Sequence, residues 1–158
     1  MKKQACAFIG HKPQKFHFGY DELYEDCLRL KAVLAWEIKA MLAQGVTTFY
    51  TGMSLGADMW CAEIVLALRE ELPQLGIELI AVIPFEGQAN RWSNDYRERY
   101  FSILDKAQAE ICLQAHYSKG CLARATAIWR ITPAACWPYM TAARAKRAVP
   151  WNMPAHAT

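Results

Sequence analysis

The stretch TGMSLGAD, residues 51–58, joins a strand-like run to a helix-like run and decides how the rest of the chain is interpreted. The residues before it, VTTFY, are β-branched and aromatic, which is typical of a strand. The residues from about 57 to 72 are apolar at helical spacing. Gly52 and Gly56 permit a tight turn between these two runs. The stretch therefore predicts a strand, a turn that contains glycine, and a helix.

Strand-like and helix-like runs alternate on both sides of this stretch. Four strands that alternate with three helical segments favour βαβ units and a parallel sheet. We therefore predict an α/β protein with a Rossmann-like three-layer α/β/α fold, a mainly parallel sheet covered on both faces, and an incomplete or irregular C-terminal part. The strands are expected at residues 5–9, 46–52, 78–85 and 109–114, and the helices at 21–43, 57–72 and within 88–107.

The loops that follow the strands are the expected place for a ligand, because ligands bind beyond the carboxyl ends of parallel strands. These loops are residues 10–12, 51–58, 84–92 and 116–120. The helix start after Gly56 offers amide donors and a positive dipole end, which suit a phosphate or a carboxylate. The pattern is neither a P-loop nor a GxGxxG motif, so an ordinary strand-to-helix turn stays open as the alternative.

Several side chains in these loops suit a nucleotide-like ligand. Lys12 could neutralise a phosphate, and His11 could donate to it or transfer a proton near neutral pH. Trp92 could stack on a nucleobase, and Gln88 could contact the edge of a base. The competing interpretations are a solvated loop around His11 and a packing role for Trp60 and Trp92.

The net charge of +3 conceals a division of the chain. Residues 1–110 hold 12 basic and all 15 acidic residues, a net charge of −3, and residues 111–158 hold six basic residues and no acid. The net negative charge of residues 1–110 argues against strong binding to the phosphate backbone of a nucleic acid. The sequence has no apolar run of the ~20 residues that span a bilayer and no secretion signal, and its six cysteines lack metal-ligand spacing. We expect a cytoplasmic protein with no membrane association and no metal.

Four ordered motifs resemble those of the YpsA-like branch of the SLOG superfamily, which also holds DprA-like proteins and LOG-type phosphoribohydrolases. They are FIGHKPQKF, TGMSLGADMWCAEIVL, LIAVIPFEGQANRW and YFSILDKA, and the similarity runs from about residue 5 to Arg124. The resemblance implies a Rossmannoid fold that binds a nucleotide or nucleotide-derived ligand. It places the family's Gly, acidic and Trp positions on Gly56, Asp58 and Trp60, and a later Trp on Trp92.

The resemblance favours sensor-type ligand binding without catalysis, with ADP-ribose, NAD or a nucleoside monophosphate as candidate ligands and a homo-oligomer as a further expectation. Two alternatives stay open: DprA-like nucleic-acid binding, and hydrolysis of a nucleotide N-glycosidic bond with Asp58 or Glu86 assisting. LOG-type chemistry needs a later GGT-type loop followed by an acid, and this chain has no such loop. The candidate ligand-binding residues are Gly10, His11, Lys12, Thr51, Gly52, Ser54, Gly56, Asp58, Trp60, Gln88, Trp92 and Arg124.

The motifs end near Arg124, so we divide the chain into a Rossmannoid domain, residues 1–124, and a tail, residues 125–158. The tail contains ten Ala, four Pro, three of the six Trp and no acid. In a shifted reading frame, codons permitted for residues 125–132 can spell NRYMADH, and with Arg124 they make RNRYMADH, which resembles the family's next motif. We therefore hypothesise that the tail is frameshifted, with a lineage-specific extension as the alternative.

Sequencing the encoding DNA tests this hypothesis. In the shifted frame Cys136 and Trp137 must give Leu, and Trp151 and Asn152 must give Glu, whichever codons are used. We expect a single-base change near codon 124 to open a frame that continues into a glycine loop of the GGT type. If no single-base change restores that frame, the tail is a natural extension.

Overall fold

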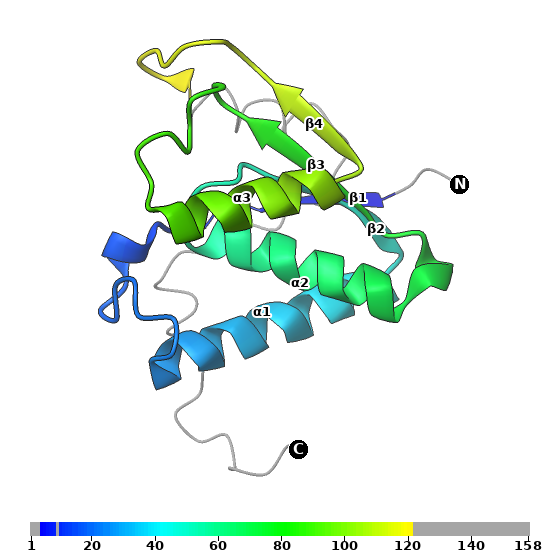
Figure 1. Ribbon diagram of the computed structural model, residues 1–158. Coiled ribbons are helices and arrows are strands. Elements are labelled where there is room, and N and C mark those ends of the chain that lie inside the picture. Colours follow the sequence, from blue (N-terminus) through cyan, green and yellow to red (C-terminus); the bar gives the residue numbers. More distant parts are fainter. Residues whose placement is uncertain (1–3, 9, 122–158) are drawn as a thin grey trace.

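The protein is described by a computed structural model that covers residues 4–8 and 10–121, so Arg124 and the tail lie outside the described residues. Four parallel strands form one sheet in the order β1-β2-β3-β4 (Figure 1). The elements are β1 (Gln4–Phe8), η1 (Pro13–Lys15), α1 (Glu25–Ala43), β2 (Val46–Thr51), α2 (Ala57–Glu71), η2 (Pro73–Leu75), β3 (Glu78–Ile83), α3 (Asn94–Lys106) and β4 (Ala109–Cys112). The predicted Rossmann-like α/β fold is confirmed.

Two helices begin later than the sequence predicts, and local hydrogen bonds explain both. The Asp21 side chain accepts the Leu23 amide at 3.0 Å and forms a turn, so α1 begins at Glu25 and not at residue 21. Ahead of α3, the Trp92 amide donates to the carbonyl of Ala89 at 3.1 Å. This second turn delays α3 to Asn94 and leaves Trp92 in the loop before it.

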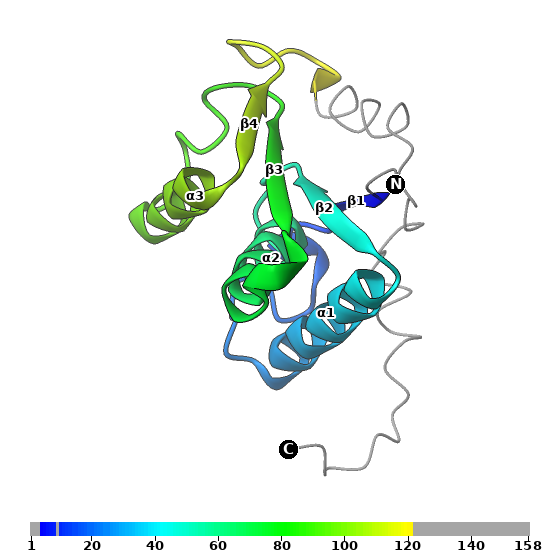
Figure 2. The ribbon, with the colours of Figure 1, turned by 90° about the vertical axis from the view of Figure 1, so that its right-hand side faces the viewer.

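The three α-helices lie side by side on one face of the sheet, with α2 between α1 and α3 (Figures 1 and 2). Each strand pairs with the strand before it in the chain, and right-handed crossovers then place successive helices on the same face. Helical cover of the second face, which the sequence predicts, is not provided by residues 4–8 and 10–121. No helix in these residues is long and apolar enough to cross a membrane.

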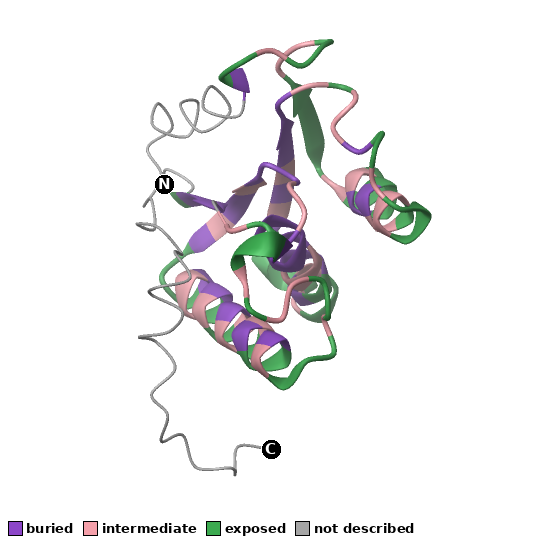
Figure 3. Cartoon of the chain, turned by 90° about the vertical axis from the view of Figure 1, so that its left-hand side faces the viewer, coloured by how far each residue is buried: buried purple, intermediate pink, exposed green. Residues whose placement is uncertain are grey.

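The core lies between the sheet and α2, the central helix. Phe8 and Phe49 stack with their ring centroids 5.6 Å apart, and Trp60 is 2% exposed. Figure 3 shows buried residues concentrated on the strands and α2, whereas β4 at the edge of the sheet is exposed. Because α2 is held by the sheet below and by a helix on each side, its N-terminus has a well-defined position at the carboxyl edge of the strands.

Candidate functional site

The loop after β1 packs directly against the start of α2. The Gly10 amide donates to Asp58 Oδ1 at 2.7 Å, and the Ala57 amide donates to the carbonyl of His11 at 3.3 Å. A Cβ on Gly10 would lie 2.3 Å from the Cβ of Ala57, and a Cβ on Gly56 would lie 2.6 Å from the His11 carbonyl oxygen. Glycine at both positions therefore lets the two loops approach each other closely.

Asp58 lies in the first turn of α2, and the residue is 5% exposed. Burial raises its pKa to about 7, although hydrogen bonds from the Gly10 amide and from Ser54, together with the charge of Lys12, act in the opposite direction. The Thr51 hydroxyl also donates to the backbone carbonyl of Asp58 at 3.2 Å. Asp58 thus links the loops after β1 and β2. Its carboxyl group accepts hydrogen bonds from amides that an external anion would otherwise bind.

The turn between β2 and α2 has an unusual backbone. Met53 has a φ of 56°, in the left-handed region that non-glycine residues rarely adopt, and its side chain is fully buried. Its amide donates to Thr51 Oγ1 at 3.2 Å, which holds this conformation in place. Gly56, at the other end of the turn, has a φ of 96°. The turn is therefore held rigidly by its own contacts before any ligand arrives.

The loop after β3 joins the same edge through Gln88. Gln88 Nε2 donates to the carbonyl of Gly52 at 3.1 Å. Because a carbonyl oxygen can only accept, the nitrogen end of the Gln88 side-chain amide must face Gly52. Gln88 Oε1 is buried and has no hydrogen-bond partner among the described residues. Further along, the Glu86 amide donates to the carbonyl of Gln114 at 3.2 Å, which brings in the loop after β4. All four loops are therefore joined, and one of them carries an unused buried acceptor.

The predicted site residues divide into two groups by exposure. Trp60 belongs to the core, where it packs against Phe16 and Phe18 with ring centroids 5.7 and 6.4 Å away. Trp92 is half-buried and packs edge-to-face against Tyr100 at 5.3 Å. The buried group is Thr51, Gly52, Gly56, Asp58 and Trp60, and the accessible group is Gly10, His11, Lys12, Ser54, Glu86, Gln88 and Trp92. Only the accessible group can touch a ligand without rearrangement.

An ion-pair cluster joins α2, α3 and the segment before α1, and it is not predicted from the sequence. Arg99 donates to Glu22 at 2.7 and 3.2 Å and to Glu63 at 2.9 Å through each of two nitrogens. Burial raises the pKa of Glu22, but hydrogen bonds from Arg99, Lys31 and Trp60 outweigh it and bring the pKa down to about 2. No local signal could reveal this cluster, because its members are far apart in the chain.

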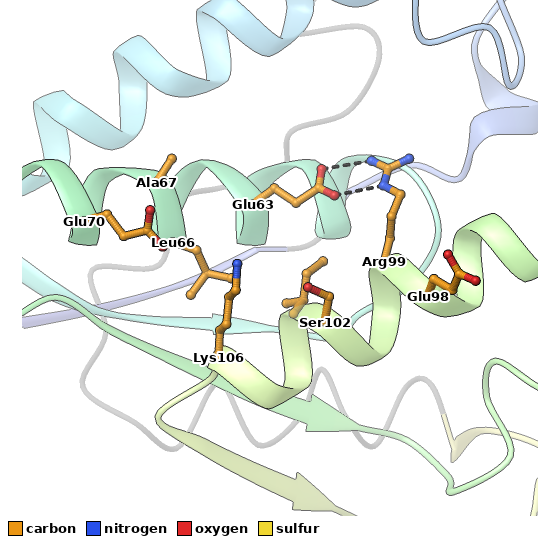
Figure 4. Close-up of a pocket in the computed structure, with 9 residues that line it drawn as sticks. Glu63, Leu66, Ala67, Glu70, Glu98, Arg99, Ser102 and Lys106 are labelled. Atoms are coloured by element: carbon orange, nitrogen blue, oxygen red, sulfur yellow. Dashed lines mark hydrogen bonds and ion pairs between the residues drawn. The ribbon is translucent and has the colours of Figure 1, made fainter.

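A groove of about 460 Å³ lies between α2 and α3 (Figure 4). The Glu63–Arg99 ion pair borders it, so the one arginine in its lining is already paired with carboxylates. The groove therefore lacks a free guanidinium to receive a phosphate. It is lined by Glu63, Leu66, Ala67, Glu70, Glu98, Arg99, Ser102, Ile103 and Lys106. Among the described residues, no group of three potential metal ligands is found.

A parallel α/β sheet whose glycine-containing loops meet at its carboxyl edge defines a Rossmann-like protein. Residues 6–127 match the family model described as the YspA SLOG family. The chain belongs to this family, which confirms the resemblance found in its motifs.

Curated relatives include UPF0398 proteins of three Bacillus species. The one from Bacillus pumilus (strain SAFR-032) is 35% identical over 102 residues, 64% of this chain and 53% of the relative. The UPF0398 protein of Bacillus velezensis is 30% identical over 108 residues, covering 68% and 57%. The UPF0398 protein YpsA of Bacillus subtilis (strain 168) is 30% identical over 111 residues, covering 70% and 59%. The chain spans about half the length of these relatives.

Replacing Gly10 by alanine tests the close packing of the two loops. The added methyl group would overlap Ala57, and we expect the free energy of unfolding to fall by about 1–3 kcal/mol in urea denaturation. Gly87→Ala is the matched control, because its Cβ would crowd only the exposed Asn90 side chain, which can shift, and would meet Phe85 at an ordinary contact distance of 3.9 Å. Equal costs for the two substitutions would contradict a tight contact at Gly10.

The raised pKa of Asp58 predicts a dependence of stability on pH. The pKa is 3.8 for the ordinary group and about 7 in the folded protein, so the folded state holds the proton more strongly. The contribution of Asp58 to stability is therefore most favourable below pH 4 and falls as the pH rises toward 7, by up to about 4 kcal/mol.

Asp58→Asn keeps the acceptor for Gly10 and removes the ionisable group. We expect its urea denaturation midpoint to lack the fall between pH 4 and 7 that the unsubstituted chain shows. Asp105→Asn, at an exposed carboxyl on α3, should keep the fall. The same pH profile in the unsubstituted chain and in Asp58→Asn would disprove the assignment.

Proposed function

We propose that this chain binds a nucleotide or a nucleotide-derived ligand at the carboxyl edge of its sheet, as a sensor-type member of the family. The observation that carries the proposal is the meeting of the loops after β1, β2 and β3, which Gly10, Ala57 and Gln88 join by hydrogen bonds. Such preformed edges are where α/β proteins bind ligands. Around it lie an exposed cation, Lys12, and the half-buried His11.

The phosphate is expected beside Lys12 and His11, not on the first amides of α2. The Ala57 amide already donates to the His11 carbonyl, and Asp58 accepts from Gly10 and Ser54. A second anion at that point would also face the Asp58 carboxylate whenever it is ionised. Beside the Lys12 ammonium group a phosphate avoids repulsion by the Asp58 carboxylate and still meets a positive charge.

The base is expected beside Gln88. A buried acceptor without a partner is costly, so Gln88 Oε1 favours a ligand that brings it a donor, provided that the half-buried Gln88 side chain shifts to expose this oxygen. The Gly52 carbonyl holds the amide nitrogen away from the ligand, so Gln88 accepts and does not donate there. The exocyclic amine of adenine is such a donor, and hypoxanthine has only a carbonyl oxygen at that position. Among the candidate ligands, ADP-ribose, NAD and AMP fit this requirement.

Calorimetric titration of the full chain with AMP, IMP, NAD and ADP-ribose tests the proposal. We expect AMP to bind about 10-fold more tightly than IMP, since one hydrogen bond to a buried acceptor is worth about that factor. Gln88→Leu should remove this preference. Lys12→Ala should weaken both nucleotides by about 10- to 100-fold, and Lys106→Ala, at an exposed lysine at the end of α3 and outside the four loops, should not.

The outcomes separate the candidate functions. Binding without change of the ligand supports a sensor. Release of free base, detected by chromatography of the same mixtures, would replace the sensor by an N-glycosidic hydrolase. If none of the four ligands binds, or if Lys12→Ala and Gln88→Leu change nothing, the assignment of the site is overturned.

A further inference from the structure

The outer face of α1 carries an apolar stripe that no described element covers. The side chains that face the core are Cys27, Leu30, Leu34, Ile38 and Leu42. On the opposite side Leu28 is 50% exposed, Trp36 is 67% exposed, and Ala32 between them is also exposed. The helix lies at the end of the helical layer, beside α2 and away from α3 (Figures 1 and 2). An exposed tryptophan and leucine on one helix face suggest a surface that binds another protein.

The residues of this stripe are arranged symmetrically about Ala32. Leu28 and Trp36 lie four residues on either side of it, and Glu25 and Lys39 lie seven residues on either side. At 100° per residue, all of them fall within about 40° of one line along the helix. Glu25 and Lys39 carry opposite charges, and both are exposed. When a second α1 helix runs antiparallel to the first, the apolar residues therefore face apolar residues and each charge faces an opposite charge.

We propose that this stripe binds a second copy of the chain, with the two α1 helices antiparallel and a two-fold axis at Ala32. In this arrangement Leu28 of each copy contacts Trp36 of the other, and Glu25 of each copy pairs with Lys39 of the other. Ala32 meets its own equivalent, and its small side chain lets the helices approach closely. A parallel arrangement would instead bring like charges together, so the charges select the antiparallel one.

The size of the surface sets the expected strength of the pair. A helix of 19 residues is about 28 Å long, so one pair of helices buries less than the ~800 Å² per partner of a standard interface. The dimer should therefore be weak and should dissociate on dilution. Glu25 already pairs with Arg29 of its own helix, but its side chain is 74% exposed, which leaves it open to a second cation. This dimer does not depend on the proposed ligand.

Disulfide cross-linking tests the position of the axis. Ala32→Cys places two thiols against each other, and mild oxidation of the full chain should give a covalent dimer. Ala43→Cys is the control, because Ala43 is also exposed on α1 but lies about 33 Å from its equivalent in the antiparallel pair. A chain without an added cysteine controls for Cys112, which is exposed. Equal cross-linking at residues 32 and 43, or none at residue 32, would overturn the proposal.

Charge reversal tests the partner without cross-linking. Glu25→Lys gives a stripe with two cations, and Lys39→Glu gives one with two anions, so each variant alone should self-associate at least about 10-fold more weakly in sedimentation experiments. An equimolar mixture of the two should recover a dimer, because both pairs are then complementary. Lys119→Glu, which makes the same charge change elsewhere, should behave like the unsubstituted chain.

Three results would overturn the proposal. The unsubstituted chain could remain at its monomer mass of 18.0 kDa over the whole concentration series. The single variants could dimerise as well as the unsubstituted chain, which would place the interface elsewhere. The mixture could also stay monomeric, which would mean that the stripe binds a different protein. Far-UV circular dichroism of each variant checks that the helix content of the protein is unchanged.

Discussion

The hydrogen bond from the Gly10 amide to the Asp58 carboxyl, 2.7 Å long, is the contact on which the carboxyl edge of this protein depends. It joins residues that are 48 positions apart and brings the loop after β1 against the first turn of α2. The contact requires glycine at residues 10 and 56, since a side chain at either position would overlap with the neighbouring loop. It also demands a buried carboxyl group, and the desolvation of that group is what raises its pKa.

This contact changes what the glycine-rich turn can do. A helix N-terminus usually offers free amides to an anion, but here the first amide of α2 donates to the His11 carbonyl, and the Asp58 carboxyl in the first turn accepts the Gly10 amide of the neighbouring loop. The turn between β2 and α2 is therefore best understood as a rigid support. Groups on its border, such as His11, Lys12 and Gln88, remain to meet a ligand. In the same way Trp60 supports the core, whereas Trp92 is half-buried in the loop after β3.

The order of strands and helices was predictable because it depends on local patterns. Apolar runs, β-branched residues and glycine positions mark β2 and α2 within a few residues of their observed ends. The start of α1 was less predictable, because the turn made by Asp21 competes with the helix for the same residues. The cluster of Glu22, Glu63 and Arg99 could not be predicted, since it forms only when α2 and α3 pack together.

The sequence by itself determined the class of fold, the family and the loops that would meet at the sheet edge, because the ends of parallel strands must lie together. Only the tertiary structure decided which residues of those loops are available. Burial depends on neighbours from distant parts of the chain, and it separates Asp58, which is enclosed, from Lys12, which is exposed. The strand order likewise decided that all three helices share one face, since each strand pairs with its predecessor.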